Sequence, residues 1–174
     1  MSNKYNILLR VCDKVESVHN VSRVFGLNKI QTIKVCFYSM YQALQDNQFQ
    51  FIIIGDDLST ELLDFFSKFN NVIVDNEKLG SAAKSLQKQI DVALSIPDDE
   101  WVYMCEDDYL HSPQAFKYIS EFIKNKEKYL KTSHKKKNYM NRIIGDLSII
   151  PLIIHPPDYP DRYMPPWKRL SFIF

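Results

Sequence analysis

Short apolar runs alternate with helical stripes along this chain, and this alternation limits its fold more than any other feature. Segments of strand length with apolar cores lie at 5–12, 49–57, 70–76 and 100–109. Apolar residues recur at helical spacing over 30–46, 60–69 and 80–96. Ser112 followed by Pro113 is typical of a further helix start, which we expect to run to about Lys135. The order predicts an α/β fold with a mostly parallel central sheet and helices on both faces.

Composition fits one ordinary globular domain. The chain has 174 residues, 45% of them hydrophobic and 25% charged, so we expect residues 1–174 to form a single domain. A net charge of +1 gives no overall field that would recruit nucleic acid. The N-terminus has no apolar signal-peptide core, and the three cysteines form no CxxC pair. These features predict a cytoplasmic protein with reduced thiols.

Acidic residues follow two of the predicted strands. Asp56 and Asp57 end the second, and Glu106, Asp107 and Asp108 end the fourth. Parallel sheets bind ligands at the carboxyl ends of their strands. Clustered carboxylates repel one another unless a cation neutralises them, and Mg²⁺ or Mn²⁺ prefers oxygen ligands shared with a diphosphate. The pattern therefore predicts a metal site here, and the alternative is a solvated acidic turn that caps the next helix.

Three segments follow one another along the chain: FIIIGDDLS, NEKLGSAAKSLQKQIDVAL and VYMCEDDYL. In this order they resemble the GT-A-type nucleotide-sugar glycosyltransferases, close to family 2. The first is similar to the family's nucleoside-contacting segment, the second to its helix under the diphosphate, and the third to its acid-x-acid (DXD) metal motif. The resemblance covers roughly residues 5–125 and implies a Rossmann-like three-layer sandwich. It implies a nucleotide-sugar-binding half at 1–110, followed at 111–174 by a basic helix and a short acceptor-side segment.

The resemblance also implies a function. It predicts a metal-dependent glycosyltransferase, with Mn²⁺ or Mg²⁺ as cofactor, that uses a UDP-sugar and a glycan, lipid or protein acceptor. Asp56 and Asp57 would lie near the base and ribose, and Glu106 would meet the ribose hydroxyls. Asp108 would ligate the metal, and Asp107 would face the donor sugar as a candidate catalytic residue. The other expected nucleotide-sugar contacts are Arg10, Cys12, Asp13, Gly80 and Lys84.

The last third of the chain supplies further candidates. His155 is a possible second metal ligand, and the alternative for it is a structural loop histidine. An inverting enzyme needs a base near the acceptor hydroxyl, and Asp158 is our candidate, with Asp146 and Asp161 as alternatives. The lysine-rich stretch 124–137 suits either a solvated helix end or contact with an anionic membrane.

Two alternative functions stay open. The chain ends on the apolar residues 172–174, which suggests a truncated chain or a missing C-terminal piece. A catalytically incomplete, nucleotide-sugar-binding remnant of the same fold is therefore the main alternative. A receiver-like signalling module is the other, but a receiver has its acidic pair after the first strand, where this chain has only Asp13.

Overall fold

A parallel sheet forms the centre of the protein. The computed structural model describes residues 4–14 and 24–125, all within the compact unit Met1–Lys126. Four strands in these residues are ordered β3-β2-β1-β4, and every neighbouring pair is parallel. Their bounds are β1 Lys4–Val11, β2 Gln48–Asp56, β3 Val72–Glu77 and β4 Trp101–Glu106. The predicted α/β class with a parallel central sheet is confirmed.

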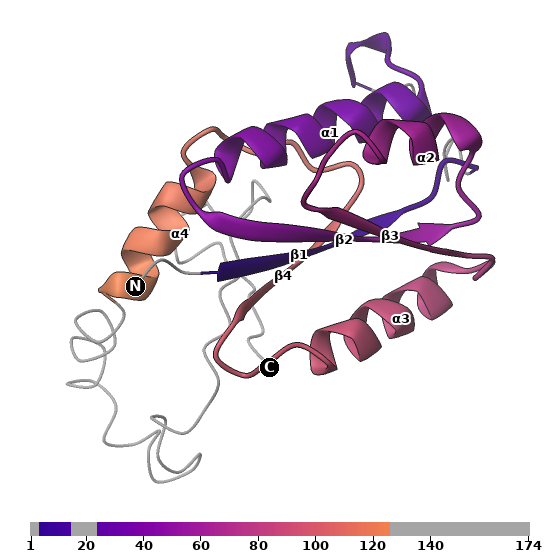
Figure 1. Ribbon diagram of the computed structural model, residues 1–174. Helices are drawn as coiled ribbons and strands as arrows, with labels where there is room; N and C mark the ends of the chain where they lie inside the picture. Colours follow the sequence, from indigo (N-terminus) through magenta and orange to yellow (C-terminus); the bar gives the residue numbers. More distant parts are fainter. Residues whose placement is uncertain (1–3, 15–23, 126–174) are drawn as a thin grey trace, which may run out of the picture. The chain divides into compact units, whose positions relative to one another are not determined.

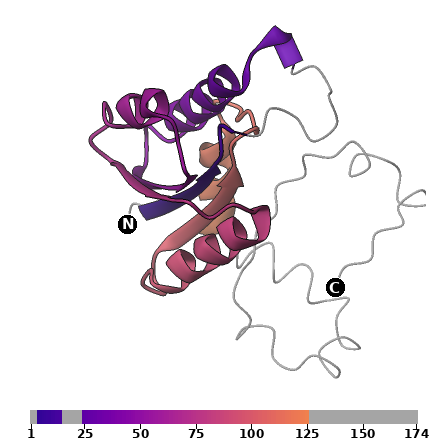
Figure 2. The same cartoon turned by 90° about the vertical axis from the view of Figure 1, so that its right-hand side faces the viewer.

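Helices cover both faces of this sheet, as predicted (Figures 1 and 2). On one face lie α1 Lys29–Ala43 and α2 Thr60–Phe66, and α3 Ala82–Leu94 lies on the other. The last described helix, α4 Ala115–Lys124, packs on the α1 side, where the Phe116 ring lies 5.5 Å from the Tyr5 ring. A short 3-10 turn, Val24–Gly26, precedes α1.

The core is richest between β2, α1 and α2. The Phe37 ring of α1 lies 4.9 Å from the Phe51 ring of β2 and 5.3 Å from the Phe66 ring of α2. All three side chains are fully buried. Tilted and edge-to-face ring pairs of this kind add to the stabilisation that comes from burying apolar area. This packing fixes the β2 strand and the acidic turn that follows it.

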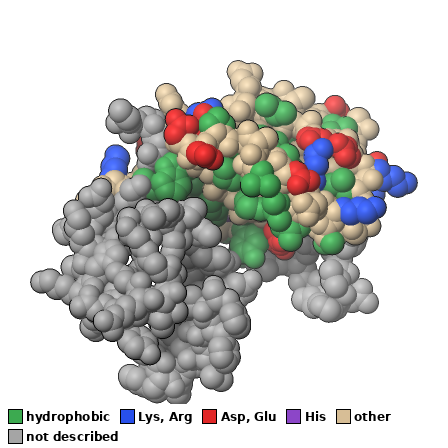
Figure 3. Space-filling view, turned by 90° about the horizontal axis from the view of Figure 1, so that it is seen from below, with side chains coloured by type: hydrophobic (Ala, Val, Ile, Leu, Met, Phe, Trp, Pro, Cys, Tyr) green, Lys and Arg blue, Asp and Glu red, His purple; other side chains and the backbone are tan. Residues whose placement is uncertain are grey.

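Helix α3 buries polar residues and exposes an apolar stripe. Ser85 and Gln89 face the sheet and are buried, while the apolar residues Leu86, Ile90 and Leu94 are exposed. Figure 3 shows hydrophobic side chains on the surface of the molecule seen from below. The Gln89 side-chain amide donates hydrogen bonds to the backbone carbonyls of Leu8 at 2.7 Å and Cys105 at 3.3 Å. The periodicity over 80–96 thus predicted the helix correctly but not the face that it buries.

Two boundaries differ from the prediction. Helix α4 begins at Ala115 rather than at Pro113, because the Ala115 N–H bonds the Ser112 carbonyl in a preceding turn at 2.9 Å. It ends at Lys124, with Asn125 as its C-cap, well before Lys135. Of the helices in the described ranges, none is both long and apolar enough to cross a membrane.

Candidate functional site

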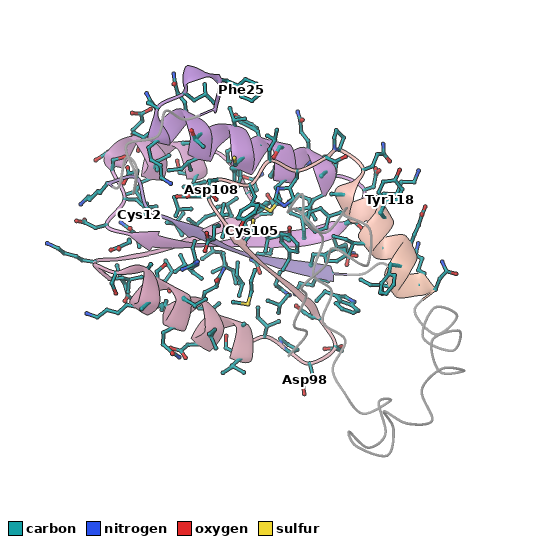
Figure 4. All side chains as sticks on the ribbon, turned by 180° about the vertical axis from the view of Figure 1, so that it is seen from behind. Cys12, Phe25, Asp98, Cys105, Asp108 and Tyr118 are labelled. Atoms are coloured by element: carbon teal, nitrogen blue, oxygen red, sulfur yellow. The ribbon has the colours of Figure 1, made fainter. Side chains whose placement is uncertain are left out.

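The two acidic turns lie at one edge of the sheet, on either side of β1. Strand β1 is central, with β2 on one side and β4 on the other, and all three run in the same direction. Asp57 therefore follows one neighbour of β1 and Asp108 follows the other. Figure 4 shows Cys12 and Asp108 toward this edge, while Asp98 and Tyr118 lie toward the opposite end. The topology places Asp57 and Asp108 at the same edge of the sheet, whereas the other predicted metal ligand, His155, lies outside the described residues.

On the β2 side, Asp57 is held in an exposed turn. Its φ is +53°, a left-handed conformation that Asp tolerates better than most residues, and its N–H bonds the Glu77 carbonyl at 2.8 Å. Its carboxylate pairs with the Lys14 ammonium. The hydrogen bond from Lys14 lowers the pKa of Asp57 below its usual value. Asp57 is thus an ionised, solvent-facing group.

The carboxylates of Asp56 and Asp13 accept hydrogen bonds from backbone N–H groups of neighbouring loops. The Asp56 carboxylate accepts hydrogen bonds from the Leu79 N–H at 2.7 Å and the Gly80 N–H at 2.9 Å. Gly80 has a φ of +73°, which favours glycine. Asp13 accepts from the Ser59 N–H at 3.1 Å through one carboxylate oxygen. Both carboxylates therefore shape the loops around the edge, Asp56 at the start of α3 and Asp13 at the start of α2.

Close packing behind the β2 turn requires a glycine at position 55. A Cβ added there would lie 2.7 Å from the Asn76 side-chain oxygen and 2.7 Å from a Leu58 methyl carbon. The same Asn76 oxygen accepts a hydrogen bond from the Leu58 N–H at 2.9 Å. The glycine lets the end of β3 and the acidic turn approach each other.

On the β4 side, Arg10 and Glu106 form an ion pair on the α3 face of the sheet. The Arg10 guanidinium also donates to the Ala82 carbonyl, in the first turn of α3, at 3.2 Å. Lys84, in the same turn, is exposed, and its N–H bonds the N-cap hydroxyl of Ser81 at 3.3 Å. Arg10 of β1 and Lys84 of α3 thus contribute positive charge near the acidic turn that follows β4.

Asp107 is turned inward. It is buried, its Oδ1 lies 2.6 Å from the Lys29 Nζ, and its Oδ2 accepts the Cys12 N–H at 3.0 Å. The residue expected to face the donor sugar thus joins the ends of β1 and β4 to the start of α1. Sequence reasoning missed Lys29, although a cation in the first turn of a helix opposes the helix dipole and so indicates another partner.

Asp108 is the acid of this turn that remains available. It is exposed, and within 4–14 and 24–125 no hydrogen bond or ion pair engages its carboxylate. Oxygen donors of this kind suit Mg²⁺ or Mn²⁺. The described part of the chain holds no group of three His, Cys, Asp or Glu side chains placed to bind a metal. Asp108 is therefore a single exposed oxygen donor, without a group of such ligands around it in the described residues.

Two of the cysteines near this edge, Cys36 and Cys105, are buried. Burial raises the pKa of Cys36 to about 11 and that of Cys105 to about 12. Cys12 lies at the edge with a partly exposed side chain, and its described contribution is its N–H bond to Asp107. Sulfur chemistry therefore has no support from Cys36 or Cys105.

Several predicted site residues lie outside the described residues. They are Asp146, His155, Asp158, Asp161 and the lysine-rich stretch beyond position 125. Comparisons of the chain with protein-family models, with curated proteins and with solved structures gave no match.

Proposed function

We propose that the carboxyl edge of the sheet binds a nucleoside diphosphate sugar, with UDP as the nucleotide, and that the protein is a metal-dependent glycosyltransferase of GT-A type. The observation that carries this proposal is the convergence of the two acidic turns on either side of β1. One turn supplies the exposed carboxylate of Asp57, and the other supplies the exposed carboxylate of Asp108, which has no partner among the described residues. The start of α3 lies beside the second turn, where Arg10 reaches Ala82.

Each side chain has a distinct task in this proposal. Asp57 accepts hydrogen bonds from the base or ribose, while Asp56 and Asp13 hold the surrounding loops. Lys84 and the first turn of α3 favour the negative diphosphate, because helix N-termini attract anions. Asp108 supplies an oxygen ligand for Mn²⁺ or Mg²⁺, and such a cation stabilises the charge that develops on a departing diphosphate.

Donor binding without transfer is the second candidate function. The observation that favours it is the burial of Asp107, the candidate catalytic residue, in an ion pair with Lys29. A carboxylate engaged on both oxygens is poorly placed to act on a sugar or an acceptor hydroxyl. In that case the edge retains nucleotide affinity and lacks turnover.

Thermal unfolding with Mn²⁺ and UDP tests the shared step. At a ligand concentration of about 100 times Kd, native-state binding adds about 2.7 kcal/mol, which raises Tm by roughly 5–10 °C for a chain of this size. Asp108→Asn should remove the part of the shift that depends on Mn²⁺. The matched control is Asp98→Asn, an exposed acid at the opposite end of the sheet, which should keep the full shift.

Turnover separates the two candidates. Release of UDP from UDP-glucose or UDP-galactose in the presence of Mn²⁺ supports the transferase, and binding without release supports the donor-binding protein. No change in Tm with any nucleoside diphosphate and Mn²⁺ contradicts both. An Asp108→Asn variant that keeps the whole metal-dependent shift contradicts the assignment of the ligand.

A further inference from the structure

Arg10 holds an ion pair within the proposed diphosphate site. It is the register partner of Glu106 on the neighbouring strand, and the two side chains pair on the α3 face. The side chain of Arg10 is 15% exposed, whereas that of Glu106 is 51% exposed. The cation is thus largely enclosed by the fold, and its anionic partner is the more solvent-exposed member of the pair.

The guanidinium of Arg10 has more N–H donors than it has described hydrogen-bond partners. It offers five N–H donors, of which one meets Glu106 and another meets the Ala82 carbonyl. Its Nε is buried and lacks a hydrogen-bond partner among the described residues. Leaving a buried donor unsatisfied is unfavourable, so this guanidinium is suited to an anion with more acceptor oxygens than one carboxylate provides.

The ion pair between Arg10 and Glu106 can also be separated at a low cost in free energy. An ion pair with one half-exposed member contributes little, because water screens it and because the released carboxylate is well solvated. A diphosphate offers more nonbridging acceptor oxygens than a carboxylate does, in a geometry that matches the guanidinium fork. An anion that binds at the start of α3 can therefore displace the Glu106 carboxylate into solvent with a small cost in free energy.

We propose that Arg10 is a diphosphate-binding residue that Glu106 masks in the free protein, so that exchange of the Arg10 partner sets the affinity for the nucleotide. This inference rests on the proposed function and deepens it. It gives Glu106 the role of a competitor for Arg10, whereas the family resemblance implies a contact with the ribose hydroxyls. The two roles predict opposite effects when the carboxylate of Glu106 is neutralised.

Isothermal titration of the full chain with UDP in Mn²⁺ buffer distinguishes these roles. Glu106→Gln should tighten binding about three- to tenfold, since the competing charge is gone. Arg10→Lys keeps the charge but loses the fork, and it should weaken binding about tenfold. In the double variant, the gain from Glu106→Gln should shrink to less than twofold, because the residue for which Glu106 competes is absent.

A matched control separates this effect from overall charge. Asp98→Asn removes the same single negative charge at the other end of the sheet, and it should change the affinity less than twofold. Titration with inorganic pyrophosphate and Mn²⁺ should repeat the order of affinities, because the contact is to phosphate. Unfolding curves of each variant establish that it is folded before titration.

The titrations distinguish a failure of the masking role from a failure of the proposed function. Weaker binding by Glu106→Gln, or unchanged binding, overturns the masking role while leaving the nucleotide site in place. An equal gain from Glu106→Gln with Lys at position 10 also overturns it, since the effect would not pass through Arg10. Absence of UDP binding by the unmodified chain overturns the proposed function itself, and the inference with it.

Discussion

The Lys29 ammonium lies 2.6 Å from the Asp107 carboxylate, and the two side chains are 11% and 10% exposed. This pair joins the first turn of α1 to the turn that follows β4. The second carboxylate oxygen accepts the N–H of Cys12, directly after β1. One buried carboxylate therefore connects three segments at the edge where the candidate site lies. Its neighbours in the sequence are Glu106, at the end of β4, and Asp108, in the turn that follows.

Removal of the cation from this pair should destabilise the protein strongly. Lys29→Met leaves the Asp107 charge buried without its partner, and breaking a buried pair in this way costs about 3–5 kcal/mol. Urea unfolding measures the loss. Lys29→Met combined with Asp107→Asn should recover part of it, because no uncompensated charge remains.

Lys68→Met is the matched control for this prediction. Lys68 is exposed, and the same substitution there should change the free energy of unfolding by less than about 0.5 kcal/mol. Equal effects at positions 29 and 68 would show that the buried pair contributes nothing of its own.

The polar face of α3 carries the second prediction. Gln89→Ala removes the donor to the carbonyls of Leu8 and Cys105, both in the interior, and should cost about 1–3 kcal/mol. Gln87→Ala is the control on the same helix, since Gln87 is exposed and its side chain donates a hydrogen bond to the exposed Asp91. We expect a loss at position 87 of no more than about 0.5 kcal/mol. Similar losses at both positions would contradict the role of Gln89.

Local patterns were sufficient for the elements and for the edge at which the acids lie. The apolar run at 51–54 predicts a buried strand, and β2 has both neighbours that such a run implies. Once the strands are parallel, Asp57 and Asp108 must meet at the same edge, because each follows the carboxyl end of its strand. That part of the site follows from chain direction alone.

Partners of the charged groups could not be predicted in the same way. Glu106 meets Arg10, which is 96 residues away, because β4 pairs with β1 in one particular register. The register of two strands far apart in the sequence depends on how their buried faces match one another, which the pattern of one segment alone does not show. An arginine inside the apolar run at 5–12 was the available signal, since a charge in a central strand requires a partner.

The buried face of α3 could not be predicted, for a related reason. Apolar spacing indicates a helix over 80–96, yet Leu86, Ile90 and Leu94 are exposed and the side-chain amide of Gln89 is buried, where it bonds two carbonyls. Lys88 pairs with Asp75 and Glu77 of β3, which fixes the rotation of the helix about its axis. The described contacts that hold α3 on the sheet thus include polar ones from Lys88 and Gln89.

Gly55 provides a third prediction. Gly55→Ala places a methyl group 2.7 Å from the Asn76 side chain and from Leu58, so one of them must move. Overpacking of this kind typically costs about 1–3 kcal/mol. We expect a lower urea midpoint with an unchanged m-value. Asn76→Ala combined with Gly55→Ala should relieve the contact with the amide oxygen, and a double variant that loses the full sum of the two single effects would contradict this clash.

The fourth prediction concerns pH. Burial lowers the pKa of His111 below its ordinary value of 6.5, while its ring bonds the Tyr103 hydroxyl at 2.9 Å and stacks on Phe116. The native state therefore binds this proton less readily than the unfolded chain does. Stability contributed by the neutral imidazole is present above pH 6.5 and is lost as pH falls below that value. Urea unfolding from pH 7.5 to pH 5 should show this decline.

His111→Phe isolates the contribution of this residue. The substitution keeps an aromatic ring against Phe116 and removes the titrating group, so it should lower stability at pH 7.5 through the lost Tyr103 bond. The slope of stability against pH between 5 and 6.5 should flatten in the variant, because no buried imidazole then resists protonation. The carboxylates of Asp57 and Glu100, whose pKa values are lowered by hydrogen bonds from Lys14 and Lys4, respond at lower pH and are unchanged by the substitution. A slope that stays as steep in His111→Phe would place the pH response on another group.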